Sequence, residues 1–139
     1  MKPKRTLDIT LLAGSFFLWS LLGWLRLREA ISIWSLLTHS LNFPQPEYLI
    51  FSAVCWGCAG LVFALGLMCR WRWARFSPFA ALGFVLWYWI ERVTLTRGDP
   101  AWTNLVFSVG ISVFWLAYAV GVVAVAGKRG YFAGWKGDK

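Results

Sequence analysis

Residues 102–126 read WTNLVFSVGISVFWLAYAVGVVAVA, and no charged residue interrupts this stretch. A helix needs roughly 20 mainly apolar residues to cross the hydrocarbon core of a bilayer, and this segment exceeds that length. A soluble domain of this size must keep much of its area in contact with water and has little use for such a run. The stretch therefore predicts a membrane-spanning helix.

The composition of the whole chain points the same way. The chain has 139 residues, of which 59% are hydrophobic and 14% are charged. A typical soluble domain has about 45–50% apolar and about 25% charged residues. The length is enough for one domain, and the excess of apolar surface predicts contact with lipid.

Three more apolar runs lie upstream of residue 102, and the last and shortest of them contains Glu91 and Arg92 in its final turn. Backbone polar groups in lipid must be satisfied within their own segment, so these runs must be helices. Pro44, Pro46 and Pro100 break the chain between them. The sequence predicts an all-α protein, an integral membrane four-helix bundle. It forms a single transmembrane domain over residues 1–139, with spans at 8–27, 48–69, 78–93 and 102–126.

The segment between the first two spans, residues 28–41, is too short and too polar to cross the membrane. Its polar and apolar side chains recur at helical spacing, which is typical of a helix lying in the membrane interface. We predict an external interfacial amphipathic helix between helices 1 and 2, which forms a lid over the bundle. The alternative is a cover or docking face for a partner or an apolar ligand. The polar positions are Arg28, Ser32, Ser35 and His39, and the apolar positions are Ile31, Ile33, Trp34, Leu36, Leu37 and Leu41.

Lysine and arginine are unevenly divided between the two sides of this predicted bundle. Ten of the 14 fall on the side that holds both termini and the loop between the second and third spans. The positive-inside rule places this side in the cytoplasm, so we predict a bacterial cytoplasmic (inner) membrane protein with both termini cytoplasmic. The ten residues are Lys2, Lys4, Arg5, Arg70, Arg72, Arg75, Lys128, Arg129, Lys136 and Lys139, and the other four are Arg26, Arg28, Arg92 and Arg97.

Charged residues near the outer face are the first place to look for a binding site. Ion pairing or snorkelling to the surface accounts for Glu91 and Arg92 at the end of a span. The alternative is a polar site beneath the interfacial helix, with Glu29, His39 and Glu91 converging. For a bound quinone, pigment or lipid, the candidate cofactor-binding residues are Trp34, His39 and Glu91.

Cys55-Trp56-Gly57-Cys58 is a C-x-x-C motif inside the second span. A helix N-terminus favours thiolate, but Cys55 lies about two turns below the start of the span, so both thiols are expected to stay protonated and to pack as small apolar groups. The motif and the four-helix topology resemble the bacterial disulfide-generating quinone oxidoreductases of the DsbB type. The resemblance implies a thiol oxidoreductase with Cys55 and Cys58 as its redox residues. The second cysteine pair of that family has no counterpart here, because residues 94–101 contain no cysteine.

Other chemistry-bearing patterns are missing from the sequence. Phosphate-binding loops, nucleophile elbows and suitably spaced carboxylate pairs are absent. One histidine and three dispersed cysteines do not make a zinc site. The net charge of +8 does not indicate nucleic-acid binding, because the basic residues flank apolar runs. The sequence predicts no catalytic residue, no metal site, no required cofactor and no nucleic-acid partner.

Small residues recur four positions apart in the second and fourth spans. Such pairs let helix backbones approach closely where lipid removes the hydrophobic drive for association. Four short helices cannot use every such groove internally while also presenting so many aromatic side chains. We therefore expect contacts with other membrane helices, in a homo-oligomer or a hetero-complex. The helix-packing residues are Ala53, Gly57, Gly60 and Ala64 in the second span and Ala117 and Gly121 in the fourth.

These observations favour a small multi-pass membrane protein that is a non-enzymatic accessory or scaffold subunit of a bacterial inner-membrane complex. Its partners would be the lipid bilayer and other membrane helices. The first alternative is a quinone-, pigment- or lipid-binding membrane protein, with the ligand beneath residues 31–41. The second is a DsbB-like thiol oxidoreductase that uses Cys55 and Cys58.

Overall fold

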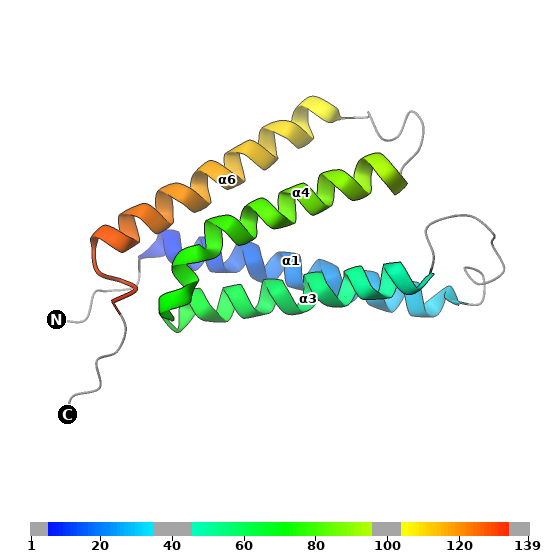
Figure 1. The fold of residues 1–139 in the computed structure, drawn as a ribbon, viewed down its shortest axis with the longest axis horizontal. Coiled ribbons are helices and arrows are strands. Elements are labelled where there is room, and N and C mark those ends of the chain that lie inside the picture. The colour runs from blue at the N-terminus through cyan, green and yellow to red at the C-terminus, as the bar shows by residue number, and fades with distance from the viewer. Residues whose placement is uncertain (1–5, 35–45, 96–103, 134–139) are drawn as a thin grey trace.

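The computed structural model describes residues 6–34, 46–95 and 104–133. All regular structure in these ranges is helical, which confirms the predicted all-α class. The α-helices lie in two layers, with α1 and α3 in one layer and α4 and α6 in the other (Figure 1). Their bounds are Leu7–Ser32 for α1, Pro46–Met68 for α3, Ser77–Leu95 for α4 and Leu105–Lys128 for α6, and a short 3-10 helix, η1, covers Arg72–Phe76.

Helix α1 is longer than the first predicted span. It runs without interruption to Ser32, so residues 28–32, predicted as the start of a separate interfacial helix, instead extend α1. The physical reason is that no glycine or proline follows Trp24 before Ser32, and the Leu, Arg, Glu and Ala residues there are good helix formers. The rest of the predicted interfacial helix, residues 35–41, lies outside the described residues.

Helices α1 and α3 are in close backbone contact along their lengths (Figure 1). A Cβ atom on Gly23 would lie 2.5 Å from the backbone nitrogen of Gly57, and one on Gly60 would lie 2.6 Å from the carbonyl oxygen of Phe16. The Ser20 hydroxyl donates a 2.7 Å hydrogen bond to the Gly57 carbonyl. Glycine is required where the two backbones are this close, because any side chain would push the helices apart.

The chain turns sharply between α3 and α4. The Trp71 amide donates to the Gly66 carbonyl at 2.9 Å, and the Arg70 amide donates to the Leu67 carbonyl at 3.4 Å. These two bonds define a Schellman motif, and its left-handed position is filled by Arg70, with φ 59°, rather than by the usual glycine. The 3-10 helix η1 and Pro78 at the start of α4 then send the chain back along the first layer.

An aromatic core joins the two layers at the middle of the helices. Trp19 of α1 lies 4.7 Å from Trp56 of α3 and 5.9 Å from Phe84 of α4, measured between ring centroids. Phe16 of α1 lies 5.4 Å from Trp115 of α6. Each of the four helices thus places at least one ring in this cluster, and ring pairs at these separations are favourable beyond their buried area.

Three of the described helices, α1, α3 and α6, are long and apolar enough to cross a membrane. Helix α4 is not among them, because Glu91, Arg92 and three neighbouring aromatic residues with polar atoms lower its mean hydropathy. The three helices are consistent with a membrane location, and they overlap the predicted spans at residues 8–27, 48–69 and 102–126.

Candidate functional site

Glu91, near the C-terminal end of α4, is a carboxylate enclosed by three helices. Only 9% of the residue is exposed. Its Oε2 atom accepts a 2.6 Å hydrogen bond from Nη1 of Arg26, and the two side chains form an ion pair. Its Oε1 atom accepts hydrogen bonds from the Tyr48 hydroxyl and the Trp87 indole N–H, both at 3.0 Å. Arg26, Tyr48, Trp87 and Glu91 are referred to below as the Glu91 cluster.

The topology explains why these residues meet. Because successive helices run in opposite directions, the end of α1, the start of α3 and the end of α4 lie at the same end of the molecule (Figure 1). Arg26 comes from α1 and Tyr48 from the first turn of α3. Trp87 and Glu91 are four residues apart, so they share one face of α4. The indole N–H of Trp87 also lies 3.2 Å from the Tyr48 hydroxyl, which closes the cluster.

The hydrogen bonds and the ion pair of the Glu91 cluster join α1, α3 and α4. An ionised carboxylate away from water is stable only when it is paired and hydrogen-bonded, and Glu91 has both kinds of partner. Both of its oxygens accept from donors on the protein, and these three hydrogen bonds occupy most of the roughly four acceptor positions of a carboxylate. Within the described residues, no three His, Cys, Asp or Glu side chains are close enough to hold a metal ion.

Arg92 makes a second set of polar contacts on a face of α4 that is rotated by about 100° from that of Glu91. Its Nη1 atom donates to the Tyr88 hydroxyl at 2.6 Å and to the Ser108 hydroxyl of α6 at 2.8 Å. The guanidinium also lies 5.6 Å from the centroid of the Trp89 ring, within range of a cation–π interaction. Glu91 therefore connects α4 to the first layer, and Arg92 connects α4 to α6.

Of the other residues predicted near this site, Trp34 and Glu29 are described, and neither is in the Glu91 cluster. Trp34, just beyond the end of α1, is 37% exposed. His39 lies outside the described residues. Glu29 is exposed on α1. Among the described residues of this set, Glu91 lies in a built polar site, where its hydrogen-bond partners are Arg26, Tyr48 and Trp87.

The cysteines Cys55 and Cys58 lie in the interior of α3, with their thiols free. Cys55 is partly buried, and Cys58 is exposed at the outside of the helix pair. Cys69, also free and exposed, lies just after the end of α3. Neither Cys55 nor Cys58 is at a helix N-terminus, which is a common position of reactive cysteines.

The small residues singled out in the sequence have two different environments. Ala53, Gly57, Gly60 and Ala64 are buried on α3, and both glycines contact α1. In contrast, Ala117 and Gly121 are exposed on α6. A Cβ atom on Gly121 would meet no other atom within 4 Å among the described residues. The α3 groove is filled by α1, and the α6 groove is open.

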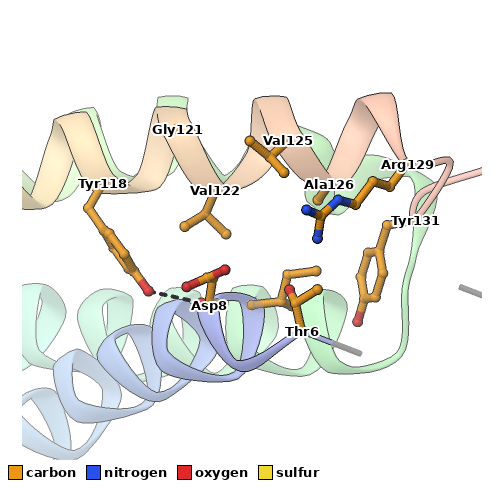
Figure 2. Close-up of a pocket in the computed structure, with 10 residues that line it drawn as sticks. Thr6, Asp8, Tyr118, Gly121, Val122, Val125, Ala126, Arg129 and Tyr131 are labelled. Carbon is orange, nitrogen blue, oxygen red and sulfur yellow. Dashed lines mark hydrogen bonds between the residues drawn. The ribbon is translucent and has the colours of Figure 1, made fainter. Parts of the chain in front are cut away.

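A pocket of about 540 Å³ lies at the opposite end of the molecule from the Glu91 cluster, between the start of α1 and the end of α6 (Figure 2). Figure 2 shows the Asp8 carboxylate pointing from α1 toward α6 and the Arg129 guanidinium pointing from α6 toward α1. The Tyr118 hydroxyl donates to the backbone carbonyl of Asp8 at 3.2 Å. Apolar side chains, including Val122 and Val125, line the rest of the wall.

The Arg129 end of this pocket is fixed by a second Schellman motif. The Tyr131 amide donates to the Ala126 carbonyl and the Gly130 amide to the Gly127 carbonyl, both at 3.0 Å. Gly130 has φ +69°, a conformation that glycine adopts without strain. This turn brings Tyr131 to the end of α3, where its hydroxyl donates to the Leu67 carbonyl at 3.0 Å.

The sequence pattern indicated Glu91 but gave little sign of its partners or of the pocket. The four-residue spacing of Trp87 and Glu91 is a signal that could have indicated their contact. Nothing comparable relates Glu91 to Arg26 or Tyr48, which are 65 and 43 positions away in the chain. The pocket lining likewise comes from opposite ends of the sequence.

Comparisons with known proteins add no assignment. No protein-family model, curated protein sequence or solved structure matches this chain.

Proposed function

We propose that this protein is a multi-pass membrane protein of the bacterial inner membrane that crosses the bilayer four times. In this proposal it is a non-enzymatic accessory subunit, and it binds other membrane helices through the exposed face of α6. The proposal is supported by the three helices of membrane-spanning length and by the surface that each leaves uncovered.

Helix α4 is suited to be the fourth crossing. Its 19 residues give a length of about 28 Å at 1.5 Å per residue, close to the roughly 30 Å of the hydrocarbon core. Its charged residues, Glu91 and Arg92, lie at one end and bind partners on other helices. Charges in a membrane are tolerated when they are paired in this way, so the lower hydropathy of α4 does not prevent insertion.

The orientation proposed here keeps both termini in the cytoplasm. With four crossings, the loop that contains Arg70, Arg72 and Arg75 and the residues flanking α1 and α6 at the terminal end lie on one side. Ten of the 14 lysine and arginine residues are on that side. This excess is the distribution expected for the cytoplasmic face.

The single observation that carries the accessory role is the open face of α6. In the most apolar 18-residue stretch of each helix, the buried share is only 17% for α6, compared with 33% for α1 and 39% for α3. Ala117 lies on the side opposite the buried residues Ala119, Val122 and Ala126, since successive residues rotate by about 100° around a helix, and Gly121 lies between this open side and the pocket that it lines. A second helix can approach there as closely as α1 approaches α3.

Native mass spectrometry of the untagged protein, extracted gently from its own membrane, tests this proposal. We expect it to appear with other membrane polypeptides. Ala117→Leu should release these partners, because leucine fills the groove without touching the buried face. Ile111→Leu is the matched control, since Ile111 is 54% exposed and lies well away from the groove on the same helix. A chain that appears alone, or partners that remain bound to the Ala117→Leu variant, would refute the accessory role at this face.

The two alternative functions gain no specific support from the geometry. The segment predicted to cover a ligand at the outer face, residues 31–41, is only partly within the described residues. The cysteines Cys55 and Cys58 lie in the middle of α3, away from both helix ends, and their thiols are free.

A further inference from the structure

We infer that the pocket between α1 and α6 binds the headgroup and upper acyl chain of a zwitterionic phospholipid with a primary ammonium group, of the phosphatidylethanolamine type. The inference rests on the proposed membrane embedding, but it does not depend on the partner at the α6 groove. It is carried by three features of the pocket: its position along the helices, its pair of opposite charges and its apolar wall.

The position of the pocket suits an amphiphile. Arg129 caps the C-terminal end of α6 and Asp8 lies in the first turn of α1, so both charges are at the level where the helices leave the apolar layer. From Arg129 to Tyr118 the wall follows α6 for about 16 Å toward the middle of the membrane. Val122 and Val125 line this inner part. A ligand that fits would therefore be polar at one end and apolar along its length.

The two charges define the headgroup. Asp8 and Arg129 face the same pocket, yet they form no ion pair with each other (Figure 2). A guanidinium binds phosphate oxygens through charge-assisted hydrogen bonds, and a carboxylate accepts hydrogen bonds from an ammonium group. A headgroup that contains both a phosphate and an ammonium satisfies both side chains at once. An anionic headgroup without the ammonium would bind Arg129 but would bring no cationic group to the Asp8 carboxylate.

The size of the pocket limits how much of the lipid it holds. Its volume of about 540 Å³ is within the range of roughly 300–1,000 Å³ that is usual for small-molecule sites. This is enough for the headgroup and the first part of one chain, while the remainder of the lipid stays in the bilayer. The Tyr131 hydroxyl bond to Leu67 holds the closed end of the wall against α3, so the site is formed before the lipid arrives.

The test is a native mass spectrometry titration with phosphatidylethanolamine and with phosphatidylglycerol, using purified protein in detergent. We expect the wild-type protein to prefer phosphatidylethanolamine. Asp8→Asn should remove that preference by weakening phosphatidylethanolamine and strengthening phosphatidylglycerol. Arg129→Gln should weaken both lipids by about tenfold, as expected for the loss of a charged hydrogen bond. Lys128→Gln is the matched control, because it removes the neighbouring positive charge, which does not line the pocket.

A fourth variant tests whether the lipid occupies this pocket. Val125 is 47% exposed, so Val125→Trp can fill the space with little effect on folding, and it should abolish the headgroup preference. Soluble phosphoethanolamine should not displace the lipid, because it lacks the acyl chain. A wild-type preference for phosphatidylglycerol or a phosphatidylethanolamine preference that Asp8→Asn leaves unchanged would overturn the inference. Full binding by Val125→Trp or effective competition by phosphoethanolamine would also overturn it.

Failure of the inference can be told apart from failure of the proposed function. If the protein is embedded in the membrane but shows no headgroup preference, only the lipid site is wrong. If the protein is released from membranes by carbonate washing, the membrane-spanning proposal itself is wrong. Ala117→Leu, which lies outside the pocket lining, should leave lipid preference unchanged.

Discussion

At the scale of single residues, the contact between α1 and α3 depends on positions that leave no room for a side chain. A Cβ atom on Gly23 would lie within 3.0 Å of three backbone atoms of α3. Backbone atoms cannot move aside as the end of a flexible side chain can. The two glycines Gly23 and Gly60 therefore determine how closely the first layer packs.

Gly23→Ala should destabilise the protein by about 1–3 kcal/mol, because the added methyl group separates the two helix backbones. Gly14→Ala on the same helix is the control, since a Cβ atom there meets nothing within 4 Å among the described residues. That change should be neutral or stabilising by up to about 1 kcal/mol, as alanine favours helix. The free energy of unfolding in detergent micelles measures both. Equal effects from the two substitutions would contradict the close-packing account.

The ion pair between Arg26 and Glu91 is the second feature that acts at this scale. Arg26→Gln should cost about 3 kcal/mol, because it leaves a buried carboxylate without its charged partner. Adding Glu91→Gln should restore part of this loss. A double-mutant cycle on unfolding free energies should therefore give a coupling of about 1–3 kcal/mol. Additive effects would show that the two side chains do not interact in the folded protein.

At the scale of elements, α4 is the helix whose environment decides the topology. The two charged residues at its C-terminal end both bind other helices. Glu91 forms an ion pair with Arg26 of the first layer, and Arg92 donates a hydrogen bond to Ser108 of α6. If α4 crosses the membrane, the end of α3 and the start of α4 lie on the cytoplasmic side. The exposed thiol of Cys69 marks that side.

A membrane-impermeant maleimide should label Cys69 in inverted membrane vesicles but not in intact spheroplasts. Cys69 lies beside Arg70 at the polar end of α3, where the proposed orientation exposes it to the cytoplasm. Cys58 provides the internal control. It is also exposed on the protein surface but lies in the middle of α3, so lipid should protect it on both sides. Labelling of Cys69 from outside the cell would reverse the orientation.

At the scale of the whole molecule, three sets of contacts hold the second layer on the first. The aromatic core acts at the middle, the Glu91 cluster at one end, and the hydrogen bonds from Tyr131 to Leu67 and from Tyr118 to Asp8 at the other end. Because the two sets of polar contacts are at opposite ends, each should stabilise the fold independently of the other.

Combining Tyr131→Phe with Arg26→Gln tests this independence. Tyr131→Phe removes one buried hydrogen bond and should cost about 1 kcal/mol. The two losses should add to within about 0.5 kcal/mol in unfolding experiments, as expected for distant sites without shared partners. Strong non-additivity would mean that the two ends are coupled through the core.

Much of the helical architecture could be predicted from the sequence, because hydropathy and chain breaks are local properties. The predicted spans at 48–69 and 102–126 overlap α3 and α6, and the all-α class is confirmed. The end of α1 could not be predicted from amphipathicity alone, since the polar residues after Leu27 are also good helix formers. Residues 28–32 therefore extend α1, although the hydropathy pattern indicated that a separate interfacial helix begins there.

The candidate sites depended on tertiary structure. Glu91 could be identified from its position in an apolar run, but its partners Arg26 and Tyr48 are determined by the rotation and register of three helices. The pocket is also determined by the packing of the helices, because Asp8 and Arg129, from opposite ends of the chain, line the same cavity.

The sequence by itself determined that this protein is helical and apolar enough for a membrane, because each residue contributes its hydropathy and charge wherever it lies. Only the tertiary structure decided which groove of small residues is occupied by another helix and which groove is left open. Gly57 and Gly60 face α1, whereas Ala117 is exposed and Gly121 borders the pocket, with no described atom within 4 Å of a Cβ atom placed on it. The physical reason is that a groove of small residues is the same in sequence whether or not a helix lies in it. Its occupancy depends on how the helices are rotated against one another.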